Sequence, residues 1–282
     1  RGPDANGVFA KGPVALGHRR LKIIDLSERG SQPMVDPELG LALVFNGCIY
    51  NHRELRKVEG LHFRRDATDS DSEAALAAAV DGDLEALAAL RGMYAFVVAH
   101  PDGRVTAVRD PLGVKPLYWY SDNRRLAFAS TPGELARTFE LSPDLEYLAK
   151  GIRLKYYEDD GATSPFVGLR ALEPGCCLIV DLNAPAIEAS PNRYYDLAEG
   201  VASHIDALSS ISRGDALELL DAKLWEATRI RLRSDVRLGL SVSGGVDSAL
   251  ISSLMKRGVD RLTGYSFAHP DAADSEGPLV SE

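Results

Sequence analysis

The sequence predicts a mixed α+β domain followed by the first part of an α/β unit with a parallel sheet. Between residues 14 and 180 the apolar residues gather in short runs of strand length, with turns between them. Other stretches of the same segment carry Leu and Ala every three or four positions, as amphipathic helices do. Further along, a strand, a helix and a second strand follow one another, which is how a parallel sheet begins. We therefore expect antiparallel hairpins in the first part and parallel strands in the second.

The strands expected in the first part are apolar runs bounded by turn residues. They cover residues 14–16, 41–45, 94–99, 104–109, 117–120, 126–129 and 177–180. The helices expected between them cover residues 71–80, 83–90, 133–138 and 143–150. Helical stretches interrupt the series of strands, which is typical of the mixed α+β class.

The boundary between the two parts is expected between residues 196 and 214. Ser, Ala, Gly and acidic residues become more frequent there, before a new helical pattern begins. After it we expect a helix at 215–233, a strand at 236–241, a helix at 247–256 and a strand at 262–267. The predicted domains are 1–196 and 215–282, joined by a linker at 197–214.

Composition and charge exclude several classes of function. The 282 residues include 32 Lys and Arg against 41 Asp and Glu, so the formal charge is -9. This charge repels phosphate backbones and anionic membranes, and we expect no nucleic-acid partner and no membrane association. No apolar run approaches the roughly 20 residues that a bilayer span needs, and the first residues show no signal pattern. Both ends look cut, because the chain starts at Arg1 and stops in a polar stretch.

The cysteines indicate a reduced, cytoplasmic protein. Cys48, Cys176 and Cys177 cannot form a complete disulfide set, and adjacent cysteines rarely bridge each other. None of their spacings is that of a zinc site, and we expect no metal-ligating residues in this chain.

Residues 243–248, Ser-Gly-Gly-Val-Asp-Ser, are a candidate phosphate loop. They lie between a predicted strand and a predicted helix, where backbone N–H groups and the helix dipole favour a bound anion. Asp247 suits a Mg²⁺ ion beside that anion, or helix capping. The string is neither a Walker A loop nor the dinucleotide-binding Gly-x-Gly-x-x-Gly pattern. The plain alternative is a strand-to-helix turn with two glycines and a serine cap.

This string resembles the pyrophosphate loop of the ATP pyrophosphatases, which adenylate a carboxyl or carbonyl group and release pyrophosphate. The resemblance implies ATP and Mg²⁺ as cofactors. The ATP-binding residues that it implies are Val242, Ser243, Gly244, Gly245, Asp247, Ser248 and Phe267. The loop would hold the phosphates, and Val242 and Phe267 would line the adenine and ribose pocket.

Five strings in the first part occur in the order found in the class II glutamine amidotransferase domain of asparagine synthetases. They are Arg-Gly-Pro-Asp at 1–4, His-Arg-Arg-Leu at 18–21, Asn-Gly-Cys-Ile-Tyr-Asn at 46–51, Ser-Asp-Ser-Glu at 70–73, and Gly-Met-Tyr-Ala-Phe at 92–96 with its continuation at 109–118. With the phosphate loop, they make the chain resemble the glutamine-hydrolysing asparagine synthetase family. The resemblance implies a four-layer α-β-β-α sandwich of the N-terminal-nucleophile hydrolases for residues 1–196. An incomplete doubly wound parallel sheet would follow.

The resemblance also implies a glutamine site. Its residues would be Arg20, Asn46, Gly47, Cys48 and Asp71. The Arg20 guanidinium can hold the α-carboxylate of glutamine in a bidentate fork, and Asp71 would accept from the α-ammonium group. Asn46 and Gly47 would supply a side-chain amide and a backbone N–H to the oxyanion that forms when the glutamine amide is attacked.

Each of these residues has a structural alternative. Arg20 would otherwise be a surface arginine. Asp71 lies within Ser-x-x-Glu, the pattern of a capping box, and it would complement the helix dipole. Asn46-Gly47 between apolar runs is also a strong hairpin signal, and we expect the hairpin and the oxyanion role together, because a tight turn exposes the N–H.

Two departures from the family pattern concern cysteine. The family's nucleophile is a cysteine at the extreme N-terminus, ahead of the Arg-Gly-Pro-Asp string with which this chain begins, so the nucleophile is expected to be missing. Cys48 stands where asparagine synthetases usually carry Glu. It has no free amine beside it to act as base, so we expect a small half-buried residue rather than a substitute nucleophile.

The leading functional hypothesis is an ATP- and glutamine-dependent amidotransferase that makes asparagine from aspartate, present as a fragment that does not complete the reaction. One alternative is a paralogue that amidates another carboxylate, such as a peptide or a sugar acid. A second is a non-catalytic protein that retains glutamine or nucleotide pockets. The partners expected are glutamine, ATP and aspartate or another carboxylate acceptor, and a homodimer is compatible with the sequence.

Overall fold

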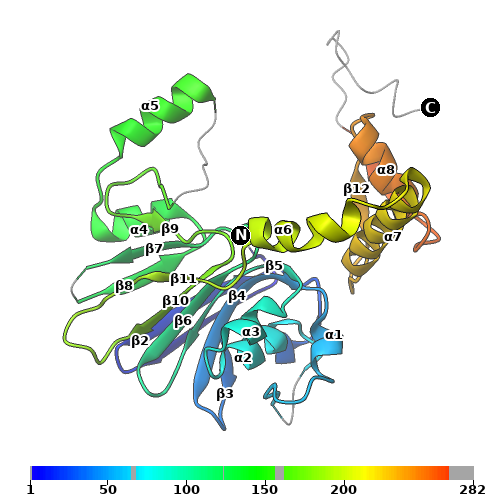
Figure 1. The fold of residues 1–282 in the computed structure, drawn as a ribbon. Helices are drawn as coiled ribbons and strands as arrows, with labels where there is room; N and C mark the ends of the chain where they lie inside the picture. The colour runs from blue at the N-terminus through cyan, green and yellow to red at the C-terminus, as the bar shows by residue number, and fades with distance from the viewer. Residues whose placement is uncertain (1, 65–67, 123, 156–161, 267–282) are drawn as a thin grey trace. The chain divides into compact units, whose positions relative to one another are not determined.

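The computed structural model describes residues 2–64, 68–122, 124–155 and 162–266. The chain divides into two compact units, Arg1–Val201 and Ala202–Glu282. Figure 1 shows the course of the chain through each unit.

The centre of the first unit is a six-stranded sheet in the order β11-β10-β6-β5-β4-β3. Its strands are β3 (Met34–Asp36), β4 (Leu41–Ile49), β5 (Gly92–Ala99), β6 (Arg104–Arg109), β10 (Cys176–Asp181) and β11 (Pro191–Arg193). Every neighbouring pair is antiparallel, as the short apolar runs predicted. Side chains of β4 alternate between the two faces, so Leu43 and Phe45 enter one core and Val44 the other.

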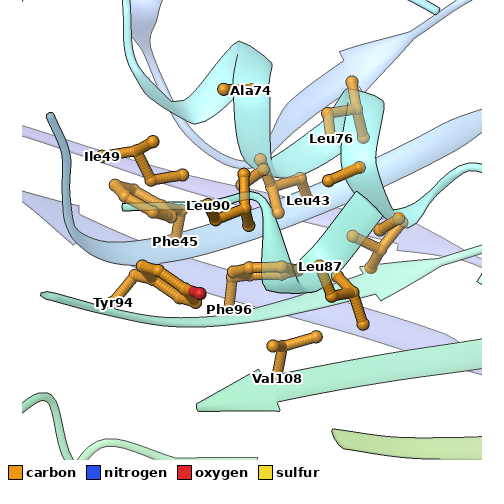
Figure 2. Packing of buried hydrophobic residues seen from close by; sticks show 14 of the residues in the cluster. Leu43, Phe45, Ile49, Ala74, Leu76, Leu87, Leu90, Tyr94, Phe96 and Val108 are labelled. Carbon is orange, nitrogen blue, oxygen red and sulfur yellow. The ribbon is translucent and has the colours of Figure 1, made fainter. Parts of the chain in front are cut away.

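Three helices cover one face of this sheet. They are α1 (His52–Leu55), α2 (Ser72–Ala79) and α3 (Leu84–Ala88). Every residue of α2 is buried, and its sequence is mostly Ala, which lets the helix lie close to β4 and β5. Figure 2 shows Leu43, Tyr94 and Phe96 packed in the core between helices and sheet. Each fully buried side chain of this size stabilises the fold by about 1.5–3 kcal/mol.

A second layer of strands faces the other side of the six-stranded sheet. It contains the three-stranded sheet β8-β7-β9, formed by β7 (Tyr118–Ser121), β8 (Leu126–Ala129) and β9 (Arg170–Ala171). Trp119 of β7 shares a core with Val97 and Leu178 of the larger sheet. On its other face Tyr120 stacks on Phe139 of α4 (Pro132–Phe139), with ring centroids 4.4 Å apart. Helices, sheet, sheet and helix therefore succeed one another, which confirms the expected α-β-β-α order (Figure 1).

The first unit also contains a hairpin, a short 3-10 helix η1 (Glu28–Gly30) and a further α-helix. Strands β1 (Ala5–Lys11) and β2 (Val14–Arg20) pair antiparallel, and β2 lies beside β4. Helix α5 (Leu145–Leu154) begins at Asp144, whose side chain accepts from the backbone N–H of Tyr147. The strand predicted at 14–16 is thus the start of a longer one, and its partner β1 was not predicted.

Asp110 organises the segment that follows β6. Its buried carboxylate accepts from the backbone N–H groups of Leu112, Val114 and Lys115 at 2.9–3.1 Å, and from Tyr94 at 3.2 Å. The neighbouring Arg109 donates to the carbonyls of Gly113, Lys115 and Leu172. A negative charge surrounded by N–H groups fixes the backbone of this segment.

Two tyrosines join the end of the first unit to its sheet. The Tyr194 hydroxyl donates to the carbonyl of Arg109 at 2.6 Å and lies 3.1 Å from the Tyr94 hydroxyl. Both rings are buried, and burial raises the pKa of each phenol well above its usual range. The pair is therefore a neutral hydrogen-bonded link.

Within residues 202–266, the described part of the second unit, two strands pair in parallel. The elements after the boundary are α7 (Arg213–Arg231), β12 (Gly239–Ser241), α8 (Val246–Met255) and β13 (Thr263–Tyr265). Leu240 of β12 pairs with Gly264 of β13, so the predicted strand, helix and parallel strand are confirmed. Arg257, just after α8, donates to both carboxylate oxygens of Asp221 on α7, each at 2.8 Å. Within the segment predicted as a linker, residues 197–208 form helix α6 (Leu197–Leu208).

Candidate functional site

Asn46 and Gly47 lie inside β4, so the prediction of a hairpin at this pair was wrong. They pair with Ala95 and Tyr94 of β5, and β4 continues to Ile49. A Cβ atom on Gly47 would lie only 2.2 Å from the Met93 carbonyl oxygen and 2.6 Å from the Tyr94 Cα. The glycine is therefore needed where two strands approach closely, and the paired strand overrides the local turn preference of Asn-Gly.

Cys48 is buried rather than half-buried, which corrects the second expectation about this strand. Its side chain is 8% exposed, and the residue pairs with Met93. Along a strand, side chains alternate, so Cys48 lies on the same face of β4 as Asn46 and opposite Ile49. A buried strand residue is poorly placed to act as a nucleophile.

Arg20 ends β2 and is buried, so it is not the surface arginine that was the alternative interpretation. Its side chain is 5% exposed. Nη1 donates to the Ser27 carbonyl at 3.0 Å, and Nη2 donates to the carbonyls of Ile24 at 3.2 Å and Asp25 at 2.6 Å. Both bidentate geometries of a guanidinium need Nη2. A carboxylate fork at Arg20 would therefore have to displace one of these two carbonyls.

Asp71 precedes α2 but does not cap it. Its Oδ2 accepts from the backbone N–H of Ile49 at 2.8 Å, and no side-chain capping bond forms. Burial raises the pKa of Asp71 to about 6, against the opposing effects of that N–H and of the Arg20 charge. An aspartate whose pKa lies close to neutral pH and whose side chain is 6% exposed suits a ligand that carries a positive charge.

The capping box predicted around Asp71 does not form. The Ser70 hydroxyl is 2.7 Å from the Ser72 hydroxyl. Glu73 instead accepts from the Thr68 backbone N–H at 3.0 Å and forms an ion pair with Arg64. The buried Glu73 carboxylate is paired with the Arg64 guanidinium and is therefore not available to bond the N-terminus of the helix.

These residues come from three elements that meet at the end of β4. The His18 ring bonds the Phe45 carbonyl at 2.9 Å, which holds β2 against the residue before Asn46. The Arg20 charge acts on Asp71, and Asp71 is bonded to the last residue of β4. The structure therefore brings a buried cation, a buried anion and the Asn46-Gly47 pair into one region.

Sequence reasoning assigned no role to three residues of this region. Asp25 and Ser27 form the loop that receives the Arg20 guanidinium, and Thr68 lies in the segment before Asp71. The Asp-x-Ser spacing at 25–27 is a turn signal that could have indicated the loop. Nothing local in the sequence indicates that the loop encloses an arginine.

The predicted phosphate loop connects β12 to α8. Gly245 is the N-cap residue of α8, and Gly244 has a φ of +73°, which glycine adopts readily. The Ser248 hydroxyl donates to the Gly245 carbonyl at 3.0 Å, accepts from the Ser243 backbone N–H at 3.2 Å and lies 3.1 Å from the Ser243 hydroxyl. The loop is thus a closed turn held by its two serines.

Other predicted nucleotide-site residues are placed as follows. Asp247 is exposed in the first turn of α8, and the N–H groups there have no side-chain cap. The Val242 backbone N–H donates to the Tyr265 carbonyl at 2.8 Å, which sets Val242 beside β13. Phe267 lies outside the described residues.

The described residues contain no group of three or more His, Cys, Asp or Glu side chains arranged to hold a metal ion. None of their helices is both long enough and apolar enough to cross a membrane.

Comparison with known proteins gives matches over both units. Residues 1–195 match the glutamine amidotransferase domain family, and residues 219–282 match the asparagine synthase family. The chain is 32% identical to asparagine synthetase [glutamine-hydrolyzing] 1 of Bacillus subtilis over 100% of its own length and 43% of that protein. It is 34% identical to a putative asparagine synthetase of Mycobacterium bovis, over 94% of the chain and 42% of the relative. It is also 32% identical to amidase chry2 of Gibberella zeae, over 92% of the chain and 38% of that relative. The chain spans less than half the length of each of these relatives.

Proposed function

Because the chain belongs to the glutamine amidotransferase domain family, with an asparagine synthase segment after that domain, we propose that it is part of a glutamine- and ATP-dependent asparagine synthetase. The observation that carries the proposal is the buried pair of opposite charges, Arg20 and Asp71, beside Asn46-Gly47. Free glutamine carries a carboxylate and an ammonium group on one carbon. A buried cation and a buried anion in one region suit that zwitterion.

The proposed glutamine site assigns each group a task. Arg20 binds the α-carboxylate and Asp71 accepts from the α-ammonium group. Asn46 and Gly47 donate to the oxyanion that develops on the side-chain amide. Ligand binding would also keep Asp71 ionised, because a neighbouring ammonium group opposes the effect of burial.

None of the three cysteines of this chain is proposed as the thiol that attacks the glutamine amide. Burial raises the pKa of Cys176 and raises that of Cys177 to about 11, so little thiolate is present at neutral pH. Cys48 is buried in a paired strand.

The second unit is proposed to bind ATP. The N–H groups at the start of α8 and the hydroxyls of Ser243 and Ser248 would hold phosphate oxygens. Mg²⁺ would neutralise charge between the phosphates, and Asp247, exposed in the first turn, fits such an ion. ATP would activate the acceptor carboxylate with release of pyrophosphate, and ammonia from glutamine would then form the amide.

One observation favours a second candidate, an amidotransferase with another carboxylate acceptor. Amidase chry2 matches at 32% identity, as closely as the Bacillus subtilis synthetase. Cys48 also departs from the Glu that asparagine synthetases usually carry. We also propose a cytoplasmic location, because none of the three cysteines, all in the described residues, is in a disulfide. A homodimer is a further proposal.

Two measurements test the function. Calorimetric titration of this chain with L-glutamine and with MgATP should give saturable binding of both, and absence of both would overturn the proposal. The complete reading frame should then release pyrophosphate with glutamine only when aspartate is present. Release that is independent of aspartate would replace aspartate by another acceptor, and a frame without an N-terminal cysteine would favour a non-catalytic binding protein.

A further inference from the structure

The guanidinium of Arg20 is enclosed by a loop of its own chain. Carbonyls of Ile24, Asp25 and Ser27 accept three N–H bonds at 2.6–3.2 Å, and these occupy one Nη1–H and both Nη2–H groups. A guanidinium has five N–H groups. Within the described part of the chain, the Nε–H and one Nη1–H are therefore left for a ligand.

Asp25 determines the shape of this loop. Its Oδ1 accepts from the Ser27 backbone N–H at 3.0 Å and from the Ser27 hydroxyl at 2.6 Å. Its φ is +54°, in the left-handed region that few residues other than glycine, asparagine and aspartate adopt. The left-handed turn and the two bonds together point the three carbonyls toward one guanidinium.

A second element packs against the same groups. A Cβ atom on Gly30 would lie 2.5 Å from Arg20 Nη2 and 3.1 Å from Asp25 Oδ2. The chain therefore returns directly over the guanidinium, at a position that only glycine can occupy without a shift. Residues 24–30 thus enclose the Arg20 head group from two sides.

The loop is also linked to the Asp71 side of the region. Burial alone would raise the pKa of Asp25. Hydrogen bonds from Ser27, the Arg20 charge and the Thr68 hydroxyl outweigh burial, so the pKa of Asp25 is lower than usual. The Thr68 hydroxyl in turn accepts from the Ser70 backbone N–H at 3.1 Å, one residue before Asp71.

We propose that Asp25 is a positioning residue for glutamine: it holds residues 24–27 so that their carbonyls orient Arg20 toward the substrate α-carboxylate. The inference rests on the proposed glutamine site. Asp25 does not touch the substrate, and its effect passes through Arg20. It therefore governs recognition of the carboxylate and not of the amide that is cleaved.

The first test measures ligand binding by calorimetry. Asp25→Ala should weaken L-glutamine binding about tenfold or more, because an oriented hydrogen bond to a charged group is lost. Asp25→Asn keeps an Oδ1 acceptor and tolerates the left-handed conformation, so it should stay within about threefold of the wild type. The matched control is Asp122→Ala, since Asp122 Oδ1 also accepts two hydrogen bonds within a turn, in this case from the backbone N–H groups of Arg124 and Arg125.

An analogue separates positioning from general damage. In L-glutamine α-amide a neutral amide replaces the carboxylate, so the contact that depends on Arg20 is already lost. Asp25→Ala should then change affinity for the analogue less than about twofold. Equal losses for glutamine and the analogue would overturn the proposal, as would wild-type glutamine affinity in Asp25→Ala.

A ligand-free measurement keeps the inference separate from the function. Nuclear magnetic resonance of the arginine side chains, with Arg20→Lys for assignment, should show slow exchange of the Arg20 Nη protons in the wild type and in Asp25→Asn, and fast exchange in Asp25→Ala. Slow exchange retained in Asp25→Ala would refute the positioning role. If the wild-type protein shows the slow signals, Asp25→Ala loses them and the wild type binds no glutamine, the proposed function fails while the orientation of Arg20 by Asp25 stands.

Discussion

Asp71 accepts a hydrogen bond of 2.8 Å from the backbone N–H of Ile49, which joins the residue before α2 to the last residue of β4. The bond takes the carboxylate away from the helix it precedes and toward the strand that carries Asn46 and Gly47. It also holds a group that burial makes costly to ionise. Ionised Asp71 therefore lowers the stability of the protein without ligand, while the same charge is proposed to raise the affinity for glutamine.

Asp71→Asn should remove a pH dependence of stability. Because the folded pKa is about 6 against an ordinary 3.8, Asp71 stabilises the fold at pH below about 4, and this contribution is lost as pH rises through 6. The loss is about 2–3 kcal/mol. The variant, which can still accept from Ile49, should be more stable than the wild type at pH 7, as denaturant unfolding at pH 4 and pH 7 would show.

The same variant should bind L-glutamine at least about tenfold more weakly at pH 7, because a neutral amide replaces the carboxylate that faces the ammonium group. If Asp71→Asn instead shows the same pH dependence of unfolding as the wild type, Asp71 is not the group that causes this pH dependence.

Gly47→Ala should destabilise the first unit strongly. The added methyl group would meet the Met93 carbonyl at 2.2 Å, and strand backbone has to move to relieve it. We expect a loss of about 3 kcal/mol or more in the free energy of unfolding. The matched control is Gly17→Ala in β2, where, apart from Gly17 and its two chain neighbours, no atom of the described residues lies within 4 Å of the new methyl group. If the two variants unfold at the same denaturant concentration, β4 and β5 do not approach as described.

Tyr194→Phe should cost about 1–3 kcal/mol of stability. The change removes the hydroxyl that donates to the Arg109 carbonyl and leaves the Tyr94 hydroxyl without this partner. Tyr195→Phe is the control, because its ring is only partly buried beside the same core. Thermal unfolding of both variants would show the difference, and a Tyr195 effect as large as that of Tyr194 would contradict it.

Ser248→Ala should weaken MgATP binding about tenfold, because the hydroxyl, which donates to the Gly245 carbonyl in this structure, is proposed to donate to a phosphate oxygen instead when ATP binds. Ser253→Ala, on an exposed position further along α8, should bind MgATP within about twofold of the wild type. Titration by calorimetry gives both values. Equal affinity of all three proteins would remove Ser248 from the proposed phosphate site.

Much of the fold could be predicted because apolar runs and turn residues coincide with its boundaries. The strands at 104–109 and 126–129 have their predicted bounds, and the strand, helix and parallel strand around the phosphate loop were expected. Other elements gave no such signal. β1 alternates half-buried and exposed residues without a strong apolar run, and α6 lies in a segment rich in small residues.

The sequence supplied the candidate residues of the site, whereas their contacts could not be predicted from it. Arg20 and Asp71 were identified from short strings, and both are buried. The carbonyls that hold Arg20 and the Ile49 N–H that holds Asp71 depend on chain folding over distances that periodicity does not report. Asn46-Gly47 shows the limit most clearly, because a dipeptide typical of a turn lies in the middle of a strand pair.

Asp110 fixes the segment after β6 through backbone N–H groups alone, and this has a consequence for protein engineering. The side chains of Leu112 and Val114 take no part in that network and are 62% and 56% exposed. Their identity can be changed without altering the path of the chain, whereas Asp110 cannot be exchanged for a residue with fewer acceptor positions. Positions 112 and 114 are therefore suited to carry an affinity tag, a cross-linking group or a fluorophore, because the hydrogen bonds that fix the backbone there do not depend on their side chains.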